Sequence, residues 1–558
     1  MPEPLATHQS PLTKTDWLLI GVLITLVLPL RIWLLYNTEV TARDSIGYIR
    51  YALQFEQYSW QEVLTKNHQH PGYPVLVWLM SLPMRAIDGA TTPDNMERST
   101  QLVNLFASLL LIVPMYFLGR QFFDRTVSFW SVILYQYLPI SAQHLSDGIS
   151  EPIFLVLLVS GLLQAVHAIR ERAVWRCVVC GFCTGLAYVT RPEGALILPA
   201  FACVLIVLQF RSEWRCAWQR FFACGISFLV TTALIGSIYV AVTGRITNKL
   251  SAIETLDNLV KLLSTWFSNS VWEPALKESQ TAASGSMHLF AVSFPMIDNK
   301  ALRLLRSVWA LISEVCAGFH YVGGIPALVG FWWTFGSMRR RAGFWVVMTF
   351  IMLHSFILIA LAMSVFYVSD RHVMILVLGG CFFAVAGLRE LPRRVLAWCN
   401  TNEISDGTWN AWKTWYNSAP VWFGILLFAL LAFCLPKATQ RLHGNRVGNH
   451  EAGLWLAKQI ERDDNANIVD DHAWSHFFSG LIFHEGREPA FAKDHPSKCF
   501  VVTTRSRDPL VDSLRQSGKV AKNAEVVFHW PEHDDIEKAR VVVYVQPRLY
   551  DEYPWPLR

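Results

Sequence analysis

Charged residues are scarce in this sequence. Asp, Glu, Lys and Arg make up 16% of the 558 residues, whereas a soluble globular protein carries about 25%. The deficit is uneven, because residues 437–558 hold 17 basic and 18 acidic residues and the much longer segment 1–436 holds only 56 charged residues. This composition argues against an ordinary cytosolic enzyme. It predicts a membrane-embedded domain over residues 1–436, followed by a soluble domain over residues 437–558.

Familiar catalytic and nucleotide-binding motifs are also missing. The sequence contains no P-loop, GxGxxG, GxSxG or HExxH motif, so ATP-driven transport and serine hydrolysis lose their usual sequence support. The two neighbouring histidines His68 and His70 lack the spacing of a metal site, and the net charge of +5 forms no basic stripe. We therefore expect no nucleic-acid partner, no metal site and no cofactor, although a need for a divalent metal is left open.

Long apolar runs supply the main structural signal. A bilayer crossing needs about 20 mostly apolar residues. Residues 73–88 are also apolar, but Pro74 and Pro83 favour a helix that lies along the membrane surface. Eleven other runs are predicted to span the membrane: 16–36, 101–118, 127–143, 152–169, 176–190, 193–210, 221–243, 320–336, 343–365, 372–388 and 420–436.

Arginines in the short loops predict the orientation, because cytoplasmic loops are enriched in Lys and Arg. With eleven spans, Arg191 and Arg371 are the only Lys or Arg residues in the short outer loops. We therefore expect an integral protein of a bacterial inner (plasma) membrane, with a cytoplasmic N-terminus and an extracytoplasmic C-terminal domain. Residues 37–100 and 244–306 would form long outer loops. The short inner loops contain Arg120, Arg125, Arg170, Arg172, Arg176, Arg211, Arg215, Arg220, Arg339, Arg340 and Arg341.

The C-terminal segment combines helix and strand patterns, which predicts a small α/β domain. Helices are expected at 451–462 and 508–516. Short runs rich in β-branched residues predict strands at 467–469, 500–503, 526–528 and 541–545.

Acidic residues lie at the outer ends of the predicted spans. Asp44 opens an amphipathic helix over 43–58, in which Asp44 or Ser45 is the expected N-cap, and capping alone is one interpretation of Asp44. Asp147 and Glu151 lie in the turn before the fourth span, where they could simply mark a turn and a helix start. Carboxylates held at a membrane boundary are also candidates for acid–base catalysis.

Basic and polar side chains lie at the same boundary. One interpretation is that the arginines merely extend their charged ends to the membrane interface. The other is that they bind a departing phosphate, which needs cationic donors, because an arginine offers a planar fork to its oxygens. The candidates for binding a donor phosphate are Lys66, His70, Arg191, Arg371 and His372. Candidates for an acceptor or sugar pocket are Arg43, Tyr48, Tyr73 and Glu193.

Several short motifs together resemble the GT-C glycosyltransferases, in the branch of the dolichyl-phosphate-mannose–protein mannosyltransferases and bacterial aminoarabinose transferases. The resemblance covers roughly residues 16–390. The motifs are Asp44-Ser-Ile-Gly-Tyr48, His70-Pro-Gly-Tyr73-Pro74, Leu118-Gly119-Arg120, Ser150-Glu151-Pro152 and Thr190-Arg191-Pro192-Glu193-Gly194.

The resemblance implies a helical, polytopic membrane fold and a polyprenyl-phosphate-linked sugar as donor, bound at the lipid bilayer. It implies that Asp44 is the catalytic acid of the first loop and that Asp147 or Glu151 is the acid of the second. One departure is Ser45, because many members carry a second acid there.

A single displacement is consistent with both lines of argument, with Asp44 deprotonating an acceptor hydroxyl or amine. The acceptor could be a protein, a lipid or a glycan, and the sugar a hexose or pentose. A secondary transporter is one alternative, but it should show internal repeats and ionisable groups near span centres. A non-catalytic scaffold is another, and it would leave Asp44, Asp147 and Arg191 far apart.

Overall fold

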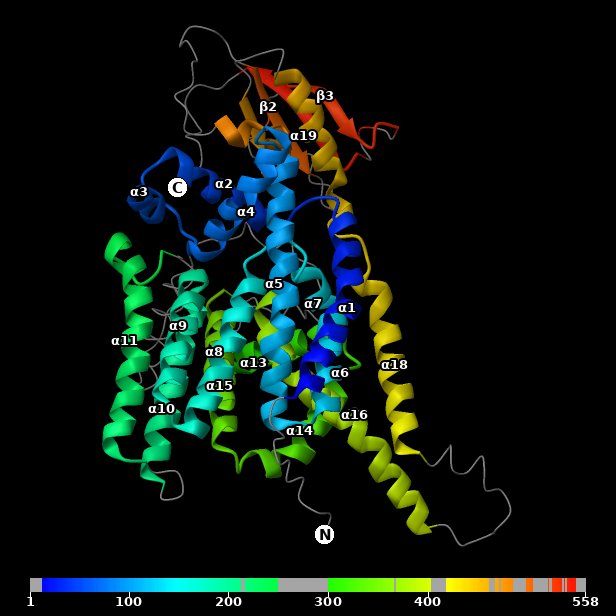
Figure 1. The fold of residues 1–558 in the computed structure, drawn as a ribbon. Coiled ribbons are helices and arrows are strands. Elements are labelled where there is room, and N and C mark those ends of the chain that lie inside the picture. Colours follow the sequence, from blue (N-terminus) through cyan, green and yellow to red (C-terminus); the bar gives the residue numbers. More distant parts are fainter. Residues whose placement is uncertain are drawn as a thin grey trace.

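A helical bundle carries a small sheet at one end, the upper end in Figure 1. The computed structural model describes residues 13–211, 216–248, 300–365, 368–402, 418–460, 467–470, 473–484, 498–504, 520, 524–533, 536 and 539–547. The helix predicted at 508–516 and most of the predicted outer loop 244–306 lie outside these residues.

Eight helical segments in the described part of the chain are long and apolar enough to cross a membrane. Each coincides with a run predicted to span, so the polytopic helical fold is confirmed, while the total of eleven spans stays a prediction. The segments are α1 (Lys14–Tyr36), α5 (Pro93–Phe122), α8 (Glu151–Glu171), η1 and α10 (Pro192–Leu196 and Ile197–Phe210), α11 (Trp218–Thr243), α15 (Ala342–Val365), η2 and α16 (Asp370–Val373 and Met374–Asn402) and α18 (Ala419–Ala438).

Shorter helices complete the bundle. The run 127–143, predicted as one span, is divided into α6 (Arg125–Tyr137) and α7 (Pro139–His144), because Pro139 has no N–H to continue a helix and instead starts a new one. α9 (Val174–Thr190) and α14 (Gly324–Met338) correspond to predicted runs. α13 (Lys300–Gly318) was not predicted, and it packs against α15, η2 and α7.

A fully buried arginine ties the first span to the helices beside it. Arg31 of α1 donates to the carbonyl oxygen of Ala142 at 2.8 Å, to the hydroxyl of Ser146 at 3.0 Å and to the carbonyl oxygen of Gln136 at 3.3 Å. These hydrogen bonds replace those that the guanidinium would make with water if it were exposed. They fix the turn that follows α7 relative to α1.

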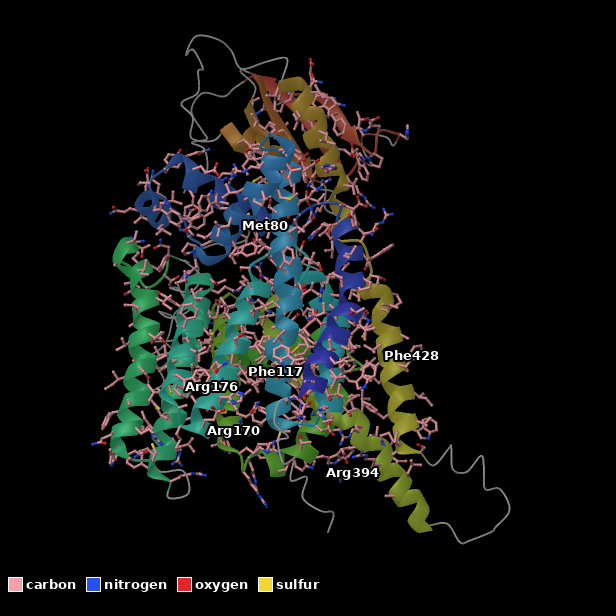
Figure 2. All side chains as sticks on the ribbon, in the orientation of Figure 1. Met80, Phe117, Arg170, Arg176, Arg394 and Phe428 are labelled. Carbon is pink, nitrogen blue, oxygen red and sulfur yellow. The ribbon has the colours of Figure 1, made fainter. Side chains whose placement is uncertain are left out.

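Three helices form a layer above the spans, in the upper left of Figure 1. They are α2 (Arg43–Gln57), α3 (Trp60–Lys66) and α4 (Gly72–Asp88). α4 packs on α2 and α5, so the apolar run 73–88 rests on other helices above the bundle. Figure 2 shows Met80 in this layer, whereas Arg170 and Arg394 lie toward the opposite end of the bundle.

The C-terminal domain has the predicted mixture of helix and strand. Its four-stranded sheet has the order β1-β2-β4-β3, with β1 parallel to β2 and the other pairs antiparallel. Alternate strand residues such as Phe500 and Val543 pack with Leu456 of α19 in one apolar cluster. The elements are η3 (Gly444–Arg446), α19 (Val447–Ile460), β1 (Asn467–Asp470), α20 (Trp474–Phe478), η4 (Leu481–His484), β2 (Lys498–Thr504), β3 (Glu525–Trp530) and β4 (Val541–Pro547).

Two contacts fix this domain against the rest of the protein. Phe477 of α20 is buried in a cluster with Ile49 of α2 and Tyr73 of α4. The backbone also pairs where the first and last spans end, because Leu442 donates its N–H to the Asn37 carbonyl and accepts from the Glu39 N–H, both at 3.2 Å. The segment between α18 and α19 is thereby held beside the start of α2.

Candidate active site

Asp44 lies near the start of α2, and its carboxylate forms an ion pair with the guanidinium of Arg371 in η2. The prediction that Asp44 or Ser45 caps α2 is wrong, since the N-cap is Ala42 and no side chain bonds there. The side chains of Asp44 and Arg371 stay 39% and 36% exposed. A ligand can therefore reach both partners of this pair.

Ser45 fixes α2 against the turn that carries Asp147. The buried Ser45 hydroxyl can donate to two carbonyl oxygens. That of Gly148 lies 2.7 Å away and that of Asp147 lies 3.1 Å away. Gly148 adopts a φ of +68°, and a β-carbon there would lie 2.6 Å from the Thr100 hydroxyl. Only glycine fits this position without strain, so the turn is shaped to receive α2.

A second, buried ion pair lies beside the first. Arg191 pairs with Glu151 at the start of α8, and the two side chains are only 12% and 5% exposed. Arg191 also contacts Glu193, with 3.3 Å between its Nη2 and the Glu193 Oε1. Although burial opposes a charge there, Glu151 and Glu193 raise the pKa of Arg191 above its usual range. Arg191 is therefore a permanent cation.

Two tyrosines line the same region. The Tyr48 hydroxyl shares a 3.0 Å hydrogen bond with the Ser150 hydroxyl, and the Tyr73 hydroxyl donates to Asn104 Oδ1 at 2.9 Å. Their rings meet edge to face at 4.8 Å. Burial, with the nearby charge of Glu151, raises the pKa of Tyr48. Tyr48 is therefore a neutral hydrogen-bonding group and not a base.

Two histidine–aspartate contacts extend the set. His144 Nε2 lies 3.1 Å from Asp370 Oδ2, and His443 Nε2 lies 2.8 Å from Asp147 Oδ1. Burial opposes charge on both imidazoles, but the neighbouring carboxylates raise the pKa of each above its usual value. Neither histidine was selected from the sequence. Local sequence gives no signal for His443, because it follows the last span and reaches Asp147 only through the fold.

Three of the predicted phosphate-binding residues have other partners. Lys66 is 69% exposed and pairs with Glu62 on its own helix at 2.5 Å. His70 is buried against the Tyr239 ring, with 4.7 Å between ring centroids. His372 accepts a hydrogen bond from the Ser369 N–H at 3.3 Å. The structure thus brings together the predicted residues Asp44, Tyr48, Tyr73, Asp147, Glu151, Arg191, Glu193 and Arg371.

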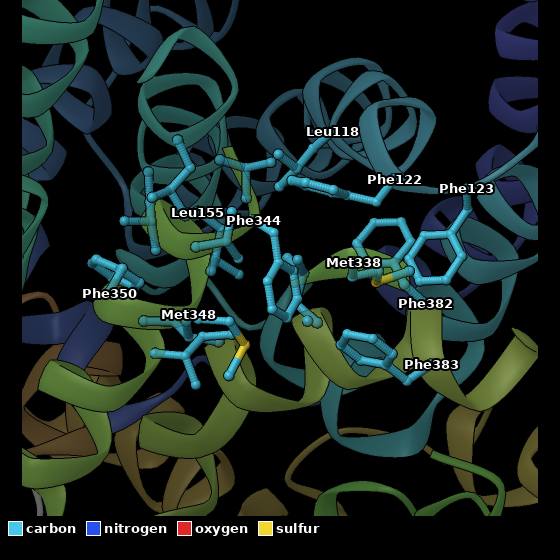
Figure 3. Close-up of a pocket in the computed structure, with 18 residues that line it drawn as sticks. Leu118, Phe122, Phe123, Leu155, Met338, Phe344, Met348, Phe350, Phe382 and Phe383 are labelled. Carbon is cyan, nitrogen blue, oxygen red and sulfur yellow. The ribbon is translucent and has the colours of Figure 1, made fainter. Parts of the chain in front are cut away.

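An apolar pocket lies deeper among the spans, and Figure 3 shows its aromatic and aliphatic lining. It is formed by side chains of α5, α8, α14, α15 and α16. Leu155 and Ile375 belong to the lining and lie one helical turn after Glu151 and Arg371. No charged residue lines the pocket, so it suits hydrocarbon and cannot perform acid–base chemistry.

The fold is similar to that of solved GT-C glycosyltransferases. One similar structure is ArnT from Cupriavidus metallidurans bound to undecaprenyl phosphate, with a TM-score of 0.53 and 15% identity over 96% of this chain and 98% of that one. Another is the apo oligosaccharyltransferase of Archaeoglobus fulgidus, with a TM-score of 0.50 and 12% identity over 88% of this chain and 70% of that one. At such identities the likeness is one of fold.

The sequence also matches a family profile. Residues 69–239 match the family described as dolichyl-phosphate-mannose-protein mannosyltransferase. No curated protein matches the chain. The family match and the fold together confirm the resemblance to GT-C glycosyltransferases of the mannosyltransferase and aminoarabinose transferase branch.

Proposed function

We propose that this protein transfers a sugar from a polyprenyl-phosphate donor to an extracytoplasmic acceptor. The observation that carries the proposal is the accessible Asp44–Arg371 pair beside the buried Glu151–Arg191 pair. An acid that can accept a proton and a cation that can neutralise a phosphate are held side by side. The apolar pocket, whose lining begins one helical turn from Glu151 and Arg371, supports a donor with a hydrocarbon tail.

The proposed reaction is a single displacement. The acceptor oxygen or nitrogen attacks the anomeric carbon, its proton passes to Asp44, and the bond from the anomeric carbon to the phosphate oxygen breaks. Polyprenyl phosphate leaves with the bonding electrons, and Arg371 stabilises the added negative charge. General-base help of this kind contributes about 10²–10⁴-fold. Arg191 stays bound to Glu151 and Glu193, and this contact holds the start of α8 beside η1.

The arginine distribution supports the orientation within the proposal. Arg170 and Arg176 lie at the end of the bundle opposite the C-terminal domain, and Figure 2 shows Arg394 there as well. Because cytoplasmic ends are enriched in arginine, we place the sites at the extracytoplasmic face of a bacterial plasma membrane. The N-terminus is then cytoplasmic, and the soluble domain of residues 437–558 is extracytoplasmic. We propose no resident cofactor for this reaction.

Direct contacts favour an enzyme over a non-catalytic scaffold. Ser45, next to Asp44, bonds to the Asp147 carbonyl, and Arg191 reaches Ser150 at 3.4 Å as well as Glu151. A non-catalytic scaffold does not require these groups to lie close together. A secondary transporter would instead need ionisable groups along a path through the bilayer, whereas the groups described above gather at one end of the bundle.

The proposal is tested with the purified full-length protein and radiolabelled polyprenyl-phosphate sugars of several kinds. We expect release of polyprenyl phosphate, by hydrolysis or by transfer to an added membrane extract. Asp44→Asn should lower this rate by about 10²–10⁴-fold. Polyprenyl-phosphate binding should be retained, because Arg371 loses a competing carboxylate.

Glu39→Gln is the matched control, since Glu39 is an acid of the same segment that pairs with Arg441 outside the site. Near-normal turnover in Asp44→Asn would remove Asp44 as the base. Failure of every donor to be cleaved by the unaltered protein would overturn the glycosyltransferase assignment itself.

A further inference from the structure

Two arginines from different domains flank one contact, between Trp474 and Thr41, beside the candidate site. Arg446 directly precedes α19, and its guanidinium lies 4.7 Å from the centroid of the Trp474 ring. The indole Nε1 of Trp474 donates to the Thr41 carbonyl at 2.9 Å. Arg43 follows two residues later, as the first residue of α2. Trp474 therefore contacts both Arg446 and the segment that precedes Arg43.

The two guanidiniums have no carboxylate partner among the residues that the structure describes. Within the described ranges, Arg43 and Arg446 form no ion pair, in contrast with Arg191, Arg371 and Arg441. Burial and the positive charge of Arg43 lower the pKa of Arg446. Two like charges held within range of each other repel, and an anion between them removes that repulsion.

The position of the two arginines relates them to the proposed reaction. Arg43 is adjacent in sequence to Asp44, the proposed base. His443, three residues before Arg446, binds Asp147 at 2.8 Å. The arginine pair therefore borders the acids on the side of the C-terminal domain. An acceptor that arrives from water would meet this side of the site, whereas a lipid donor would arrive from the bilayer.

We propose that Arg43 and Arg446 bind an anionic group, a phosphate or a carboxylate, carried by the acceptor next to its reacting hydroxyl or amine. This inference rests on the proposed function and names the acceptor's chemical class. Stacking on Trp474 covers one face of the Arg446 guanidinium and leaves its N–H edge to donate. Two guanidiniums together match the several oxygens of one phosphate or carboxylate.

Binding of inorganic phosphate to the full-length protein tests the site directly. Thermal unfolding is measured over a range of phosphate concentrations, with chloride matching the ionic strength. We expect saturable stabilisation, and an apparent Kd at least tenfold weaker in the double variant Arg43→Gln, Arg446→Gln. Arg441→Gln is the matched control, because it removes one charge from the same linker at a residue that pairs with Glu39, and it should stay within twofold.

Lysine variants distinguish loss of the anion site from a folding defect. Arg43→Lys with Arg446→Lys retains both charges and should bind phosphate at an intermediate strength. Phosphate binding that is unchanged in the double glutamine variant would overturn the proposal. So would equal losses in the lysine and glutamine variants, since charge would then not matter.

The source of the anion is decided by a second measurement, the affinity for radiolabelled polyprenyl phosphate. If the anion belongs to the acceptor, this affinity stays within about twofold in the double glutamine variant. A tenfold loss, with competition by inorganic phosphate, would assign the two arginines to the donor and overturn the acceptor assignment. Both measurements are of binding, so they succeed or fail independently of the Asp44→Asn turnover test.

Discussion

The buried pair of Glu151 and Arg191 allows the sharpest test of how the site is held together. Their side chains are 5% and 12% exposed, so little water is available to replace a lost partner. Removing one member of such a pair leaves an uncompensated charge, at a cost of about 3–5 kcal/mol. We therefore expect Arg191→Gln to lower the free energy of unfolding by about that amount. Glu151→Gln should cost less, because Glu193 still neutralises Arg191 at 3.3 Å.

The double variant Glu151→Gln, Arg191→Gln separates the pair from its surroundings. It leaves two neutral amides that can bond to each other, so its loss should be smaller than the sum of the single losses, by about 1–3 kcal/mol. The assay is reversible unfolding of the purified protein in mixed micelles. Lys66→Gln is the control, because it breaks an ion pair whose members are 69% and 39% exposed, and such exposed pairs contribute little to stability. Equal effects of Arg191→Gln and Lys66→Gln, or strict additivity, would refute the reasoning.

Two further predictions concern the turn around Asp147. Because Asp147 raises the pKa of His443, their contact stabilises the fold fully below the usual histidine pKa of about 6.5 and progressively less as pH rises through the raised value. His443→Gln should therefore be most destabilising near pH 5.5 and least at alkaline pH, and a loss that is constant with pH would contradict this contact. Gly148→Ala should cost about 1–3 kcal/mol for strain at φ +68°, with a further loss from the 2.6 Å approach to Thr100. Gly89→Ala, at φ +70° with open space around it, measures the strain alone, and equal unfolding midpoints would rule out the steric part.

Local patterns in the sequence predict the individual elements well. The run 16–36 corresponds to α1, and the β-branched run 526–528 lies within β3. Such elements follow from burial of apolar side chains at a fixed period, which any short window of sequence displays. The division of the run 127–143 illustrates the limit of this reasoning. Its hydropathy is continuous, and only the missing N–H of Pro139 separates α6 from α7.

The partners within the site depend on contacts that no local pattern encodes. Asp44 meets Arg371 across 327 residues of sequence, and Asp147 meets His443 across 296. The acids and Arg371 could be selected, because ionisable residues at span ends are uncommon enough to stand out. His443 could not, because the segment 437–558 is rich in charged and polar residues. The expected N-cap role of Asp44 fails for the same reason, since tertiary contacts with Arg371 and the turn at Gly148 determine how α2 begins.

The pairing of Leu442 with Asn37 and Glu39 has a consequence for biosynthesis. A ribosome makes the chain from its N-terminus, so the acidic residues Asp44, Asp147 and Glu151 are synthesised long before residues 439–446 exist. The imidazole that binds Asp147 arrives only after α18 has been inserted. A nascent chain therefore carries an unfinished candidate site for most of its translation, and that site is completed in one of the last steps of assembly.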